Sequence, residues 1–169
     1  MSKRPEAAAG PADDSDREIR LTRLINAPRD RVWDAWTDPR QIVKWWGPRD
    51  FTLVVQEMDV RPGGAWKSTM IGPDGAEYRN DCVFAEVERP ARIAYALIGG
   101  RKGGEPIQMQ ASWTFEDEGE RTRIELRMLF MTAEARRRAV ELFGFIEGGV
   151  QTIARLQAHL ASPVTAERT

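Results

Sequence analysis

The stretch that decides the fold is LTRLINAPRDRVWDAWTDPRQIVKWWGPRDFTL, residues 21–53. Just before and at its start, residues 18–25 alternate charged or polar with apolar side chains, which is typical of a half-buried strand. Pro28 suits the first turn of a helix, and Asn26 or Ala27 is its expected cap. Apolar residues then recur at helical spacing in Val32, Trp33, Ala35 and Trp36.

A second short helix is expected after the first. Asp38-Pro39 ends the first helix and begins another, which carries Ile42, Val43, Trp45 and Trp46 on one side. Gly47-Pro48 is a strong breaker of regular structure. The opening of the chain therefore predicts a strand, a helix, a short turn and a second helix.

From residue 51 onward the apolar pattern has period two and keeps it for about half of the chain. It predicts strands over residues 51–60, 65–71, 77–88, 92–98, 107–116 and 121–131. Short turns separate them, such as Gly72-Pro73-Asp74-Gly75, and residues 99–104 are expected to form a flexible glycine loop. Consecutive strands joined by turns predict an antiparallel meander, and the first strand brings the sheet to seven strands.

The last element is predicted to be one amphipathic helix of about 25 residues that begins after a Thr132 cap. Its apolar stripe includes Val140, Phe143, Val150, Leu156 and Leu160. The expected fold class is α+β, with a curved seven-stranded antiparallel sheet wrapping this helix. The domain is expected to span residues 17–161, with a disordered tail over 1–16 and a frayed tail over 162–169.

Composition excludes several classes of function. Lys and Arg number 25 and Asp and Glu 26, and this balance disfavours nucleic-acid binding, which usually needs a basic surface. No apolar run approaches the roughly 20 residues that span a bilayer, and the N-terminus lacks the apolar core of a secretory signal. Cys82 and His159 are single copies, so zinc sites built from several Cys and His ligands are excluded. We expect a cytoplasmic protein without cofactor or metal.

The motifs of residues 21–53, together with two later turns, resemble those of one protein family. The pieces that match are Ala27-Pro28, Val32-Trp33, residues 35–39, Trp45-Trp46-Gly47-Pro48, the turn at 61–64 and the hairpin at 72–75. They are similar to the family of the C-terminal domain of the activator of heat shock protein 90 ATPase, within the SRPBCC superfamily of START-like and birch-pollen-allergen-like folds. The resemblance covers about residues 17–161 and implies a helix-grip fold. One departure is Gly149, which stands where this family often has tryptophan.

The resemblance also implies a kind of function. Members of this superfamily often hold lipophilic ligands in a cavity between the sheet and the long helix, and some are cyclases or hydrolases of apolar substrates. Chaperone activation, a stress-response role, belongs to a larger eukaryotic protein with an additional N-terminal domain, which we expect this chain to lack. We expect first a binder of a small apolar molecule, second an enzyme, and third a chaperone or regulatory partner-binding domain. The protein is expected to be either a monomer or a homodimer.

The candidate ligand-binding residues are mainly those that the strand periodicity places on the inner face of the sheet, where they either fill a core or line a cavity. Trp45 and Trp46 either pack the helices onto the sheet or form the rim of the cavity. The full set of candidates is Trp45, Trp46, Trp66, Met70, Tyr78, Asn80, Tyr95, Trp113, Phe130, Phe143, Glu147 and Gly149.

Glu147 is the single candidate for catalysis. It falls on the apolar stripe of the predicted long helix, between Phe143 and Val150, where burial would raise the pKa of its carboxyl group and suit it to acid–base chemistry. Tyr78 and Asn80 would then orient the substrate. The alternative is a slightly rotated helix on which Glu147 reaches solvent. The absence of paired carboxylates or a nucleotide-binding loop favours the binder over the enzyme.

Overall fold

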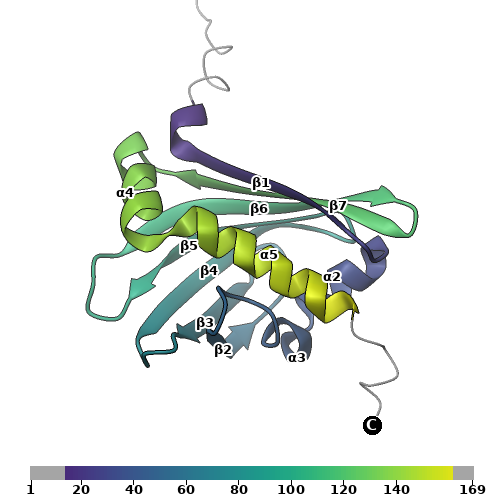
Figure 1. The fold of residues 1–169 in the computed structure, drawn as a ribbon, viewed down its shortest axis with the longest axis horizontal. Helices are drawn as coiled ribbons and strands as arrows, with labels where there is room; N and C mark the ends of the chain where they lie inside the picture. Colours follow the sequence, from purple (N-terminus) through teal and green to yellow (C-terminus); the bar gives the residue numbers. More distant parts are fainter. Residues whose placement is uncertain (1–13, 162–169) are drawn as a thin grey trace, which may run out of the picture.

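The computed structural model describes residues 14–161 and shows one curved antiparallel sheet with helices on its concave face (Figure 1). The strand order across the sheet is β1-β7-β6-β5-β4-β3-β2, and every neighbouring pair is antiparallel. The predicted α+β class, the meander and the seven strands are therefore confirmed. The strands are β1 (Glu18–Ile25), β2 (Thr52–Met58), β3 (Ala65–Ile71), β4 (Glu77–Glu88), β5 (Arg92–Arg101), β6 (Ile107–Glu118) and β7 (Arg121–Phe130).

Several strand ends differ from the predicted ranges, and β5 and β2 differ most. β5 continues through Gly99 and Gly100 to Arg101, because these glycines pair with β4 instead of entering a loop. β2 ends at Met58, before the turn at 61–64. The N-terminal tail predicted for residues 1–16 lies mostly outside the described residues, as does the C-terminal tail at 162–169. The last residues of the predicted N-terminal tail, 14–16, belong to the 3-10 helix η1 (Asp14–Arg17), and Arg17 Nη1 donates to the Phe130 carbonyl.

Two short helices follow β1, as expected, with different ends. α2 (Arg29–Thr37) is preceded by Pro28 itself at the cap position, so the cap predicted at Asn26 or Ala27 is wrong. The proline has extended backbone and its carbonyl accepts the first helical hydrogen bonds. α3 (Pro39–Ile42) is capped by the Asp38 side chain, which accepts a hydrogen bond from the Arg40 amide. Trp45 and Trp46 lie in the turn after α3, outside the helix in which they were expected.

The single C-terminal helix predicted from the sequence is in fact two helices. α4 (Ala133–Phe143) begins at the predicted Thr132 cap, whose hydroxyl accepts from the Ala135 amide, and ends at Gly144. Gly144 adopts φ 62°, a left-handed conformation that glycine tolerates best, and the chain turns there before α5 (Phe145–Ala161). Helical spacing continues across the break, so the apolar stripe concealed it. α5 lies diagonally across the concave face of the sheet (Figure 1).

The inner face of the sheet has the side chains that the alternation predicted. The core beneath it is rich in aromatic rings, and the fully buried ones are Trp36, Trp45, Trp66, Trp113, Phe84, Phe115 and Phe130. Trp36 from α2 lies at the centre, with its ring centroid 5.1 Å from that of Trp66 and 6.1 Å from that of Trp113. This dense half of the core anchors α2 and the Trp45-Trp46 turn against the middle strands.

Candidate functional site

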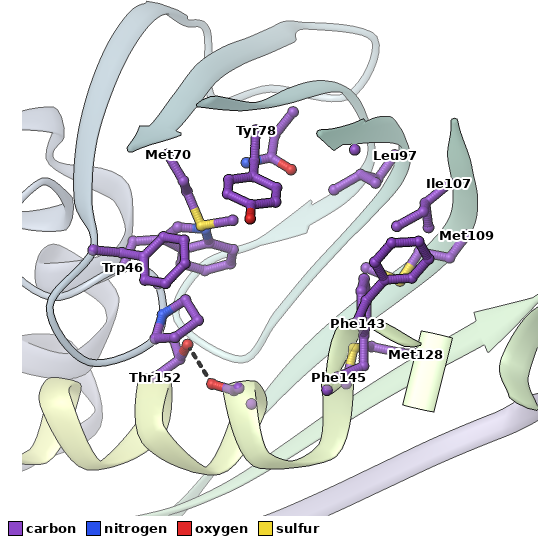
Figure 2. Close-up of a pocket in the computed structure, with 18 of the residues that line it drawn as sticks. Trp46, Met70, Tyr78, Leu97, Ile107, Met109, Met128, Phe143, Phe145 and Thr152 are labelled. Carbon is purple, nitrogen blue, oxygen red and sulfur yellow. Dashed lines mark hydrogen bonds between the residues drawn. The ribbon is translucent and has the colours of Figure 1, made fainter. Parts of the chain in front are cut away.

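A pocket of about 400 Å³ lies between the sheet and the start of α5, and it is partly open to solvent. Figure 2 shows Trp46, Met70 and Tyr78 on one side of it and Leu97, Ile107 and Met109 on the other. Phe143 and Phe145 approach from the junction of α4 and α5, and Thr152 points up from α5 (Figure 2). The walls thus come from elements that are far apart in the sequence, and most of the lining is apolar.

One side of the pocket depends on Arg155 of α5. Its Nη1 donates to the carbonyl oxygens of Gly47 at 3.1 Å, Pro48 at 3.0 Å and Phe51 at 3.2 Å. Weaker contacts at 3.4 Å join the same guanidinium to the carbonyls of Trp46 and Lys44. Burial lowers the pKa of Arg155, although the nearby Asp50 carboxylate opposes this shift. One side chain therefore holds the segment 44–51, which supplies four residues to the lining: Trp46, Gly47, Pro48 and Phe51.

The wall formed by β3, β4 and β5 contains polar groups that other described residues leave unpaired. Asn80 lines the pocket, is 9% exposed, and its Nδ2 has no acceptor among residues 14–161. Ser68, its cross-strand partner, has a hydroxyl that is likewise buried without a partner in that part of the chain. Burial raises the pKa of the Tyr95 hydroxyl, which stays protonated at neutral pH. Asn80 and Tyr95 give the apolar pocket a small number of hydrogen-bonding positions, whereas Ser68 is not among the lining residues.

The family model that matches this sequence is described as activator of Hsp90 ATPase homolog 1-like protein, and it matches residues 26–161. The chain belongs to this family. The resemblance inferred from the motifs of residues 21–53 is thereby confirmed, as is membership of the SRPBCC superfamily. No curated protein matches the chain.

Solved structures of bacterial proteins share the family's architecture with this chain. A solution structure from Arthrobacter aurescens has a TM-score of 0.80 at 26% identity, covering 90% of each chain. A crystal structure from Mycobacterium smegmatis has a TM-score of 0.78 at 29% identity, covering 92% of this chain and 95% of the other. A third, from Chromobacterium violaceum, has a TM-score of 0.75 at 25% identity, covering 87% and 99%. These likenesses extend over nearly the whole domain.

The structure brings together most of the predicted candidates of this family member, but not all. Those that line the pocket are Trp46, Met70, Tyr78, Asn80, Tyr95, Trp113, Phe143 and Gly149. Trp45 is fully buried behind them, and its Nε1 donates to the Ala35 carbonyl at 3.0 Å, so it packs the helices and leaves the rim to Trp46. Trp66 stacks on Phe84 in the filled core. Phe130 lies behind the lining residue Phe145 in an edge-to-face contact, with 5.7 Å between the two ring centroids.

Of the two alternatives stated for Glu147, burial on the apolar stripe is wrong and the solvent-exposed position is the one observed. Its side chain is exposed, outside the pocket lining, and it accepts a hydrogen bond of 3.1 Å from Gln151 Nε2 one turn along α5. The break at Gly144 is the reason, because α5 starts its own helical phase and is not a continuation of α4. The acid–base role considered for this carboxyl group depended on burial, which the structure does not show.

Gly149 lies close to the sheet. A Cβ atom at this position would lie 2.6 Å from Leu21 Cδ1, so the Leu21 methyl takes the place that an indole would need. The pocket reaches Gly149 without being created by its missing side chain.

Sequence reasoning missed several members of the lining. Leu97, Met109, Leu126 and Met128 were placed on the inner face by strand alternation, but no signal distinguished pocket from core. Leu142, Phe145 and Thr152 enter the lining because the helix breaks at Gly144, which the periodicity concealed. Arg155 had no local signal, since its partners are carbonyls about a hundred residues away.

Residues 14–161 contain no group of three or more His, Cys, Asp or Glu side chains placed to hold a metal ion. Within the same residues, no helix is long and apolar enough to span a bilayer.

Proposed function

We propose that this protein binds a small, mainly apolar molecule in the pocket between its sheet and α5. The observation that carries the proposal is the pocket itself. Its volume of about 400 Å³ falls within the range of roughly 300–1,000 Å³ found for small-molecule sites. It lies directly beside a core whose aromatic rings are closely packed, so loose packing of the whole domain does not account for it.

The character of the lining supports an adaptable apolar site. Met70, Met109 and Met128 contribute flexible, polarisable side chains that adjust to ligands of different outline. At the mouth, Leu142 is 61% exposed and Phe143 is 43% exposed, although both are large apolar residues. A ligand in the pocket would cover such side chains and gain the favourable burial of their surface.

The ionisable groups of the lining favour binding over acid–base catalysis. They are Tyr78, Tyr95 and Arg101. At neutral pH the Tyr95 hydroxyl stays protonated because burial raises its pKa, and an arginine side chain is always a cation. Groups in these states donate hydrogen bonds that orient a ligand, and none of them is a base.

The test is to fill the pocket from within. N-phenyl-1-naphthylamine, an uncharged probe whose fluorescence rises in apolar surroundings, is titrated into the wild type and Thr152→Phe. Thr152 is buried in the lining, so a phenyl ring there should occupy the pocket and weaken probe binding at least about tenfold, equivalent to roughly 1.4 kcal/mol.

The matched control is Ala154→Phe, which adds the same ring to the exposed face of α5 and should bind as the wild type does. Thermal melts check that both variants fold. A wild type that binds no apolar probe, or a folded Thr152→Phe variant that binds it undiminished, contradicts the proposal.

A further inference from the structure

We propose that the molecule held in this pocket carries an uncharged hydrogen-bond acceptor, such as a ketone or ester oxygen, and that the side-chain amide of Asn80 donates to it. This inference rests on the proposed function and specifies its ligand class: an apolar body with one neutral acceptor, in place of a pure hydrocarbon or a charged lipid head.

The first step is the position of Asn80 within β4. Its neighbours across the sheet are Ser68 on β3 and Gly99 on β5, so it lies in the middle of the pocket's strand wall. A Cβ atom at Gly99 would lie 3.1 Å from Asn80 Oδ1, which puts the oxygen end of the amide beside β5. The nitrogen end, Nδ2, is the one that has no acceptor among the described residues.

The second step is energetic. Asn80 is 9% exposed, and a buried amide N–H without an acceptor is destabilising by an amount comparable to a lost hydrogen bond. An apolar residue of similar size would fill this place on the strand without that loss. Nδ2 has almost no accessible surface in this structure, so a ligand oxygen would satisfy it after a rotation of the Asn80 amide toward the pocket.

The third step concerns charge. The lining around Asn80 includes Met70, Leu97 and Trp113, and its single cationic side chain is Arg101, which is exposed. An ionised ligand group beside Asn80 would lose its hydration, and among the described lining residues only the exposed Arg101 could offset a negative charge, so its burial is strongly unfavourable. A neutral acceptor matches the neutral donor, and the rest of the ligand matches the apolar wall.

The experiment compares two ligands of nearly identical shape, 9-fluorenone and fluorene, which differ by one carbonyl oxygen. Both compete with N-phenyl-1-naphthylamine for the wild type, Asn80→Leu and the control Gln110→Leu, an equivalent amide-to-leucine change at an exposed site on β6. We expect the wild type and the control to prefer 9-fluorenone about five- to tenfold, the effect of one buried hydrogen bond. Asn80→Leu should bind the two compounds equally.

A second measurement on the wild type avoids dependence on the variant's folding. The side-chain amide resonances of Asn80 in a ¹⁵N–¹H correlation spectrum should shift with 9-fluorenone much more than with fluorene. Equal affinity of the wild type for both compounds, or a preference that survives in Asn80→Leu, overturns the inference and leaves the pocket proposal standing. Failure of the wild type to bind fluorene, 9-fluorenone and the naphthylamine probe overturns the pocket proposal itself.

Discussion

The two halves of the space beneath the sheet are built from the same strands but are filled very differently. Beside α2, the Trp36 ring lies within about 6 Å of the rings of Trp46, Trp66, Tyr95 and Trp113. Beside the start of α5, the same strands present methionines and leucines to a pocket of about 400 Å³. The strands alternate in the same way in both halves, but their inner side chains differ in kind, and so do the helices that cover them.

The covering helices differ in the size of the side chains that they present. α2 contributes Trp33 and Trp36, both buried, whereas the first turns of α5 contribute Gly148, Gly149 and Thr152. Large rings on one helix fill the concave face, and small residues on the other leave space. The size of the helix side chains therefore contributes to where the cavity forms, over a sheet wall that is mainly apolar.

The largest effect expected from this contrast is on stability. Trp36→Ala should lower the free energy of unfolding by roughly 3–5 kcal/mol, because it removes a fully buried indole from the centre of the filled half. Met109→Ala, in the lining of the open half, should lower it by about 1 kcal/mol or less, since that half-buried side chain already borders space. Denaturant melts measure both, and equal losses would show that the halves are packed alike.

A smaller effect is expected from Arg155, which connects the two halves. Arg155→Met keeps the length of the side chain but removes the donors to the carbonyls of segment 44–51, so we expect a loss of about 2 kcal/mol. Trp46 should also lose its position at the pocket, which weakens binding of the naphthylamine probe. Arg155→Lys keeps the charge and one hydrogen-bonding group, so its stability should lie between those of the wild type and Arg155→Met. A Met variant with unchanged stability and binding would mean that the segment holds itself in place.

Most of the fold was predictable because it depends on local patterns. Three strands, β1, β3 and β4, match the predicted ranges residue for residue, since alternation and turn residues determine them. The helix break was not predictable from periodicity, because α4 and α5 both continue the same spacing of apolar residues. A glycine within a helical pattern is compatible with either a continuous helix or a left-handed end, and Gly144 takes the second.

For the site, the sequence could predict only which face of the sheet its residues share. Alternation placed Trp113 and Trp66 on the same inner surface, but Trp113 lines the pocket and Trp66 is enclosed in the core. That distinction depends on where α2 and α5 cross the sheet, which no local pattern encodes. The same limitation explains Glu147, whose exposure follows from the phase of α5 after the break.

The smallest expected changes in stability come from two glycines, one just before α5 and one in its first turn, and they have opposite signs. Gly144 has a left-handed backbone, so Gly144→Ala should lower the free energy of unfolding by about 1–2 kcal/mol. Gly148 is helical, and a Cβ there would meet Pro48 Cγ at an ordinary 3.5 Å. Gly148→Ala should therefore raise stability by up to about 1 kcal/mol, since alanine favours the helix.

The two alanine changes are chemically identical, so opposite signs in thermal and denaturant melts would isolate backbone conformation as the cause. Similar signs would contradict the break at Gly144 and restore the continuous helix that the periodicity alone predicts. A continuous helix would also carry Phe143 and Phe145 to different faces, although both line the pocket here. The pair of substitutions consequently tests, with the smallest perturbation, whether the open half owes its shape to this one left-handed glycine.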